Sequence, residues 1–214
     1  MGTRLETIGA RSSGLMGQIS GRIMNLIHRR MYRRIIEGYL FEKLELTFGN
    51  TVLDIGCGGG AAVKLFSEMM GNSKICGIDY SDEMVRLAGN VNRARIRTGT
   101  VEINAGSVAE IPYEDGLFNI ITAFDTINFW NDYTKAFSEI DRVLKENGVL
   151  VIVNGCPQEG SRWCDFVKFK TIEAYIDLLK KNCFFDVHAE LIKNTVIVYG
   201  RKINQDRLSG RVFT

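Results

Sequence analysis

From residue 51 onward the sequence alternates between short apolar runs and longer amphipathic runs, and this alternation constrains the fold more than any other feature. The apolar runs predict strands. The amphipathic runs predict helices, because their apolar residues recur every three or four positions. We therefore expect an α/β fold in which a doubly wound, mainly parallel sheet has helices on both faces. The predicted strands are 52–55, 74–79, 101–106, 118–124 and 148–155. The predicted helices are 61–70, 81–91 and 132–144.

The end of the chain predicts a change from parallel to antiparallel pairing. Residues 171–182 have the pattern of a further helix with a threonine N-cap. Residues 185–191 and 194–202 have the pattern of two strands. The Lys193-Asn194 connection is too short for anything except an antiparallel pair.

The residues before the alternating region predict an arm rather than a part of the sheet. Residues 14–47 have helical periodicity, with a break expected near residues 29–34. We expect three regions: a helical arm or lid over 1–48, the main domain over 49–203 and a tail over 204–214.

Charge is distributed unevenly between the arm and the rest of the chain. Residues 1–34 hold seven arginines and one glutamate, which gives +6, whereas the whole chain has a formal net charge of +2. Such an arm could meet an acidic substrate, nucleic acid or a membrane surface. Most charge runs are solvated helix faces, and we favour that interpretation.

The composition excludes several classes of protein. No apolar run approaches the roughly 18 residues that a membrane helix requires. The N-terminus lacks the apolar segment of a signal peptide, so we expect a cytoplasmic protein. The five cysteines are scattered and form no C-x-x-C pair, and the chain has only two histidines. We therefore expect no metal site and no disulfide framework.

The first predicted strand ends in a glycine turn, D-I-G-C-G-G-G, over residues 54–60. Glycine permits positive φ and, because it has no Cβ, lets backbone N–H groups approach a ligand closely. In a doubly wound sheet, ligands bind beyond the carboxyl ends of the strands. The second strand ends there with Asp79, whose carboxylate can accept two hydrogen bonds from a ribose diol.

Two kinds of ligand fit such a turn. Residues 56–61 match G-x-G-x-x-A, which is typical of dinucleotide sites where a diphosphate lies over a helix N-terminus. Asp54 argues against a dinucleotide, because its carboxylate would repel the diphosphate. The sulfonium and ammonium groups of S-adenosylmethionine are cations that a nearby carboxylate favours. The chain also leaves little room for the substrate-binding region of a dehydrogenase.

Three motifs occur in order: VLDIGCGGG at 52–60, GIDYS at 77–81 and NAGSVAEIPYEDGLFNIITAFDTINFW at 104–130. Together they resemble the sequential motifs of class I S-adenosylmethionine-dependent methyltransferases of the small-molecule type, closely over about 50–155. The resemblance implies a Rossmann-like, seven-stranded sheet in the order 3-2-1-4-5-7-6 with strand 7 antiparallel. It also implies that S-adenosylmethionine is the cofactor and that methyl transfer is in line.

The resemblance assigns cofactor-binding roles by position. Gly56 and Gly58 would line the methionine part near Asp54, and Asp79 would hold the ribose hydroxyls. The remaining assignments are Tyr80 and Met84 beside the adenine, Ser107 and Val108 at its edge, and Ala123 and Phe124 at the border of the methyl-transfer site.

Three positions depart from the family pattern. Ser107 and Asn119 stand where the family often has Asp, and Glu146-Asn147-Gly148 stands in place of Pro-Gly-Gly. None of these changes removes the glycines or the two acidic residues. We therefore expect cofactor binding to survive.

No catalytic motif is present, and none is required. The cofactor carries its own leaving group, and a general base is needed only when the nucleophile must lose a proton. Asp125 is the best candidate for a base or a substrate clamp. The other candidates on the acceptor side are Asn128, Phe129, Trp130, His28, Tyr32, Arg162 and Trp163. His188 is expected to be structural.

The short segment between Cys156 and Thr171 leaves no room for a large substrate domain, so we expect a small or medium-sized acceptor. Nucleic acid is disfavoured because Tyr32 is the only aromatic residue of the arginine-rich residues 1–34. Two alternatives stay open. One is a non-catalytic module that binds S-adenosylmethionine, and the other is an RNA methyltransferase guided by the arginine-rich arm.

Overall fold

A computed structural model describes residues 30–44, 49–156, 164 and 167–203. It contains a seven-stranded sheet with the strand order β3-β2-β1-β4-β5-β7-β6, which confirms the predicted order. The chain divides into two compact units, Met1–Ser107 (unit 1) and Val108–Thr214 (unit 2). The proposed arm and tail stay predictions, because most of their residues lie outside the described ranges.

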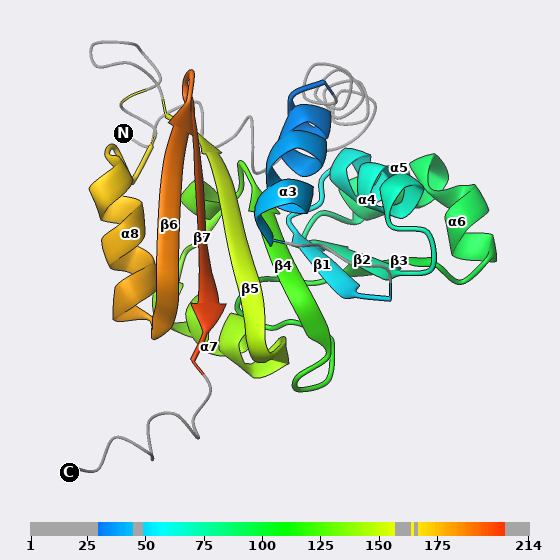
Figure 1. Cartoon of the computed structure of the whole chain (residues 1–214). Helices are drawn as coiled ribbons and strands as arrows, with labels where there is room; N and C mark the ends of the chain where they lie inside the picture. The colour runs from blue at the N-terminus through cyan, green and yellow to red at the C-terminus, as the bar shows by residue number, and fades with distance from the viewer. Residues whose placement is uncertain (1–29, 45–48, 157–163, 165–166, 204–214) are drawn as a thin grey trace, which may run out of the picture. The chain divides into compact units, whose positions relative to one another are not determined.

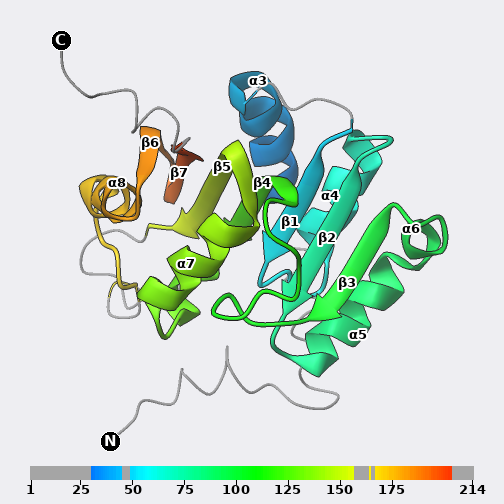
Figure 2. The same cartoon turned by 90° about the horizontal axis from the view of Figure 1, so that it is seen from below.

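The described part of unit 1 consists of parallel strands and the helices that connect them. In chain order its elements are η1 (Ile36–Leu40), α3 (Phe41–Leu44), β1 (Thr51–Ile55), α4 (Ala61–Met69), β2 (Lys74–Asp79), α5 (Asp82–Val91), α6 (Arg93–Arg97) and β3 (Val101–Ala105). β2 pairs with β1 and with β3, so that Asp54 lies opposite Gly77 and Asp79 lies opposite Ala105. Both α4 and α5 pack against β2 (Figure 2). The carboxyl ends of the three strands therefore lie at one edge of the unit.

α5 begins at the predicted residue because Ser81 caps it. The Ser81 side chain accepts a hydrogen bond from the backbone N–H of Met84 at 3.5 Å, and two acidic residues follow in the first turn. The short helix α6 has no sequence prediction. None of its residues is buried, so the segment has no apolar periodicity to detect.

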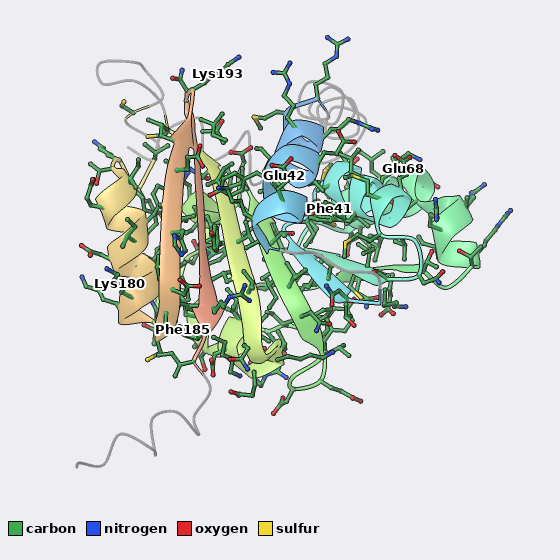
Figure 3. The ribbon with its side chains drawn as sticks, in the orientation of Figure 1. Phe41, Glu42, Glu68, Lys180, Phe185 and Lys193 are labelled. Atoms are coloured by element: carbon green, nitrogen blue, oxygen red, sulfur yellow. The ribbon has the colours of Figure 1, made fainter. Side chains whose placement is uncertain are left out.

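Residues 30–44 form one helical stretch that includes the π-helical segment η1. The break expected near residues 29–34 is therefore wrong for residues 30–34. Arg33 supports the continuous helix, because its guanidinium donates to Glu37 one turn later at 2.9 Å. It also pairs at 3.7 Å with Glu68 of α4, which is labelled in Figure 3.

The described part of unit 2 combines parallel and antiparallel pairing. Its elements are β4 (Phe118–Phe124), η2 (Ile127–Phe129), α7 (Tyr133–Val143), β5 (Leu144–Gly155), α8 (Ile172–Lys181), β6 (Phe184–Ile192) and β7 (Thr195–Lys202). β4 and β5 are parallel, and β7 runs antiparallel to both β5 and β6 (Figure 1). Lys193, with φ of 57°, and Asn194 join β6 to β7, which confirms the predicted hairpin.

One boundary in unit 2 differs from the prediction. The sequence predicts a helix through Leu144 that Asn147-Gly148 stops, but α7 ends at Val143 and Leu144 begins β5. Leu144 is fully buried and pairs with Phe118 of β4, so packing draws it into the strand. Asn147, with φ of 60°, therefore belongs to an irregular part of β5 and does not end a helix.

Two features are absent from the described ranges. No group of three or more His, Cys, Asp or Glu side chains in them is placed to hold a metal ion. No helix in them is both long enough and apolar enough to span a membrane.

Candidate functional site

The glycine turn after β1 depends on left-handed backbone at three of its glycines. The φ angles are 68° at Gly56, 50° at Gly58 and 77° at Gly60, a region that residues with a Cβ seldom adopt. The backbone N–H of Cys57 donates to the carbonyl of Ile78 at 2.9 Å, which fixes the turn to the end of β2. The conformation of the turn is therefore fixed by contacts within unit 1.

Two of these glycines serve different purposes. A Cβ on Gly58 would meet no atom within 4 Å, so the space above this residue is open to a ligand. A Cβ on Gly60 would lie 2.6 Å from Asn92 Nδ2 and 2.9 Å from Ala88 Cα. Gly60 is thus required for the close packing of the turn against α5.

Asp79 ties the glycine turn to the start of α5. The side chain is 6% exposed. One carboxylate oxygen accepts from the N–H of Gly58 at 2.9 Å, and the other accepts from the N–H of Ser81 at 3.0 Å. Burial raises the pKa of the Asp79 carboxyl, and the two N–H donors lower it by less. Because an ionised carboxylate has about four acceptor positions, two remain for a ligand.

Asp54 gives the turn a second buried acidic group. It lies in β1 and is 2% exposed. The pKa of the Cys57 thiol is raised well above its ordinary value, first by burial and then by the negative charges of Asp54 and Asp79. Both carboxylates therefore act on the turn, and their field disfavours a bound anion and favours a cation.

The other candidates of unit 1 lie at the same strand ends. Tyr80 follows β2 directly and is 57% exposed, and Met84 is half-buried in the first turn of α5. Ser107 is exposed just beyond β3. The N–H of Gly106 donates to the carbonyl of Asp79 at 3.0 Å, which joins the ends of β2 and β3. The structure thus brings the seven candidates of unit 1 to one edge.

Unit 2 carries the remaining candidates, with Val108 directly after Ser107 and the others at the end of β4. Val108 is half-buried, whereas Ala123 and Phe124 are 0% and 5% exposed. Asp125 follows them with φ of 55°, a strained conformation for a residue other than glycine. Its carboxylate accepts from the N–H of Gly155 at 2.9 Å, which joins the ends of β4 and β5.

A polar network beside Asp125 was missed by the sequence analysis. Asn154 is 1% exposed at the end of β5, and its side-chain amide donates to the hydroxyl of Tyr175 at 2.9 Å. Its oxygen accepts from Asn128 at 3.4 Å, and Asn128 in turn accepts from the N–H of Lys168 at 2.9 Å. An asparagine inside the apolar run VIVNG was the available signal, because buried polar groups need partners.

Two neighbouring acceptor-side candidates, Phe129 and Trp130, differ in their exposure to solvent. In η2, Phe129 is 55% exposed, and the following Trp130 is buried. The carbonyl of Trp130 accepts from the ammonium of Lys168 at 2.8 Å, and this ammonium lies 5.2 Å from the ring centre of Tyr133. Burial raises the pKa of Tyr133 to about 12, so its hydroxyl stays protonated at neutral pH.

The remaining candidates are Tyr32, His188 and three residues outside the described ranges. Tyr32 is 9% exposed within the helical stretch of unit 1. His188 pairs with Asp186 at 2.8 Å and stacks on Tyr199, as expected for a structural histidine. His28, Arg162 and Trp163 lie outside the described residues.

An arginine on α7 fixes the segment that follows Val108. The Arg142 guanidinium donates to the carbonyls of Ile111 and Tyr113 at 2.9 Å and 2.8 Å, and it pairs with Glu139 at 2.7 Å. The Glu139 carboxylate accepts from the N–H of Ile111 at 2.7 Å. This network holds the connection to β4 against α7.

The chain is similar in sequence to known methyltransferases. A family model described as "Methyltransferase domain" matches residues 53–152. The ubiquinone/menaquinone biosynthesis C-methyltransferase UbiE of Citrifermentans bemidjiense is 29% identical over 70% of the chain and 65% of its own length. Phosphoethanolamine N-methyltransferase 1 of Zea mays is 31% identical over 70% of the chain and 31% of its own length.

A solved structure shares the fold. The structure of an S-adenosylmethionine-dependent methyltransferase from Aquifex aeolicus aligns with a TM-score of 0.72 at 20% identity. The alignment covers 87% of the present chain and 98% of the other. The chain spans less than two thirds of the length of the two sequence relatives, whereas it matches nearly the whole of this solved structure.

Proposed function

We propose that the chain belongs to the methyltransferase family whose domain model matches residues 53–152, and that it transfers a methyl group from S-adenosylmethionine to a small or medium-sized acceptor. The fold it shares with an S-adenosylmethionine-dependent methyltransferase supports the choice of cofactor. The expected cytoplasmic location stays a prediction.

The observation that carries this proposal is the pair of buried carboxylates beside the glycine turn. Asp54 and Asp79 are 2% and 6% exposed, and after burial their negative charges are the next causes of the raised pKa of Cys57. A diphosphate at this turn would meet the negative charge of Asp54 at close range, whereas a sulfonium and an ammonium would be attracted. This electrostatic preference favours S-adenosylmethionine over NAD.

The proposed cofactor contacts are those that the family resemblance implies, and features of the strand ends support them. Asp79 retains acceptor positions for the ribose hydroxyls, and the open space above Gly58 suits the methionine part. Tyr80 and Met84 have the apolar surface that an adenine ring requires. The remaining assignments are Gly56 in the turn, Ser107 and Val108 at the adenine edge, and Ala123 and Phe124 near the methyl group.

S-adenosylmethionine supplies an activated methyl group and its leaving group when it is bound. The protein then has to orient the acceptor in line with the methyl group and exclude water, an alignment worth at most about 7–11 kcal/mol. Asp125 is the proposed base or clamp. Its carboxylate accepts from the N–H of Gly155 and the residue is only half-buried, so we expect it to be accessible to an acceptor that must lose a proton.

The acceptor class rests on the relatives. One is a quinone C-methyltransferase and the other a phosphoethanolamine N-methyltransferase, and both names specify small-molecule acceptors. The two names differ in the atom that is methylated, so we propose the size class of the acceptor and not its identity.

Isothermal titration calorimetry with S-adenosylhomocysteine tests the cofactor, and NADH is the matched control. We expect binding of S-adenosylhomocysteine and none of NADH.

Incubation with S-adenosylmethionine and a metabolite extract should then release S-adenosylhomocysteine, whereas incubation with buffer should not. Binding without turnover would favour a non-catalytic module. Turnover on RNA, with affinity that falls steeply as salt rises, would favour the RNA methyltransferase.

A further inference from the structure

Side chains hold the glycine turn at both of its ends. At one end Asp79 accepts from the N–H of Gly58 at 2.9 Å. At the other end the side-chain amide of Asn92 donates to the carbonyl of Gly60 at 3.1 Å. Asn92 is 32 residues farther along the chain than Gly60 and follows α5, so the contact joins two separate elements.

Asn92 occupies the junction between α5 and α6. It is 2% exposed, and its side-chain amide also donates to the carbonyl of Ala88 at 3.0 Å. The tight approach of Gly60 to Ala88 and Asn92 leaves no space for a methyl group. The turn therefore cannot shift at Gly60 without moving α5 as well.

The other polar atom of the Asn92 side chain, Oδ1, indicates that the bond to Gly60 is more than the end of a helix. In the described part of the chain, Asn92 Oδ1 is buried and has no hydrogen-bond partner. A buried acceptor without a partner costs free energy. A residue that only ended a helix could avoid this cost by remaining nearer the solvent.

Asn182 is such a residue. It ends α8 with nearly the same backbone conformation, and its side-chain amide donates to the carbonyl of Leu178 at 2.8 Å. Asn182 is half-buried and lies in the other unit. The two asparagines share the contact with the preceding turn of their helix, and Asn92 adds the bond to Gly60.

We propose that Asn92 is a positioning residue for the cofactor. It fixes the carbonyl of Gly60 and thereby sets the turn for the methionine part of S-adenosylmethionine. The inference rests on the proposed function, because it concerns the same turn. It assigns to Asn92 a role that differs from those of Asp54 and Asp79, since Asn92 acts through the backbone and touches no ligand.

The test is calorimetry of two ligands, S-adenosylhomocysteine and 5′-methylthioadenosine, with wild-type protein, Asn92→Ser and Asn182→Ala. S-adenosylhomocysteine contains the amino-acid part that lies along the turn, and 5′-methylthioadenosine lacks it. The variant Asn92→Ser keeps a hydroxyl that can bond the carbonyl of Ala88 but is too short to reach Gly60. Asn182→Ala is the matched control, because it removes the same kind of helix-end bond far from the turn in sequence.

For Asn92→Ser we expect the Kd of S-adenosylhomocysteine to rise roughly tenfold or more, the scale of one hydrogen bond and its geometry. The Kd of 5′-methylthioadenosine should stay within about twofold, since it makes no contact that depends on this hydrogen bond. Asn182→Ala should change neither value. Equal losses for both probes in Asn92→Ser would assign Asn92 a merely structural role and overturn the proposal.

Wild-type protein provides a measurement that does not depend on a variant folding. In nitrogen-15 NMR spectra, the side-chain amide of Asn92 should shift with S-adenosylhomocysteine but not with 5′-methylthioadenosine. An unchanged amide signal would overturn the proposal. If wild-type protein bound no S-adenosylhomocysteine, the proposed function would fail and this inference with it. If wild type bound and Asn92→Ser bound equally well, only the inference would fail.

Discussion

Asp79 joins the fold and the proposed ligand through one carboxylate. It accepts backbone hydrogen bonds from Gly58 and Ser81, and it is the proposed partner of the ribose. Replacement by alanine removes a charged acceptor, so we expect Asp79→Ala to weaken S-adenosylhomocysteine binding by about 1.5–3 kcal/mol. Calorimetry measures this change. The exposed neighbour Asp82 is the control, since Asp82→Ala should leave the Kd unaltered; equal affinities of Asp79→Ala and wild type would exclude the assignment.

The raised pKa of Asp79 predicts how cofactor affinity depends on pH. Because the folded-state pKa is raised, the contribution of this group to folding stability is present below its unfolded pKa. That contribution is lost as the pH rises through the folded pKa. A ribose diol favours the ionised carboxylate, so affinity for S-adenosylhomocysteine should fall as the pH drops through the raised pKa.

Calorimetric titrations from neutral to mildly acidic pH check this dependence. Asp79→Asn is neutral over the whole range and should lose this part of the pH dependence. The same pH profile in both proteins would show that another group is responsible.

At the scale of the elements, substitutions at two glycines of the same turn should differ in whether they mainly affect ligand binding or folding stability. Gly58→Val places a branched side chain in open space, at a φ of 50° that strains it. We expect a loss of roughly 1–2 kcal/mol in the free energy of unfolding, the usual cost of such a conformation. Binding of S-adenosylhomocysteine should fall more than in Asp79→Ala, because the side chain fills the ligand's approach.

Gly60→Ala should act mainly on stability, and any effect on binding should follow from the displacement of Asn92. Its methyl group would press on Asn92 and on the backbone of Ala88, so the main effect should be a lower unfolding midpoint. Thermal unfolding with calorimetry on both variants measures the two effects. A Gly58→Val protein that binds normally would contradict the proposed place of the methionine part.

The elements also indicate what the sequence can predict. The alternating runs were sufficient for the α/β class and the Lys193-Asn194 turn for the antiparallel hairpin, because period and turn length act locally. The strand order was predicted only from the resemblance to the methyltransferase family. The α7–β5 boundary was wrong, since Leu144 joins β5 through contact with a residue of another strand. Asp54 and Asp79 were detectable as charges inside apolar strands. Asn92 was not, because its bond to Gly60 spans 32 residues and depends on how α5 packs.

At the scale of the whole molecule, a ligand that binds only the folded chain must stabilise it. At an S-adenosylhomocysteine concentration about 100 times Kd, linkage adds about 2.7 kcal/mol. For a chain of this size, that gain raises the Tm by roughly 5–11 °C. NADH at the same concentration should leave the Tm unchanged, because Asp54 repels its diphosphate. Thermal scans with both ligands check this, and a larger shift with NADH would reverse the electrostatic argument.

The position of β7 in the sheet has a consequence for folding during translation. β7 pairs with β5 on one side and with β6 on the other, although it follows both in the sequence. While Thr195–Lys202 is still inside the ribosome, the nascent chain holds β5 with one open, apolar edge. Open edges of this kind promote association between chains. Translation that stalls before Thr195 should therefore yield a product that aggregates unless a chaperone covers it.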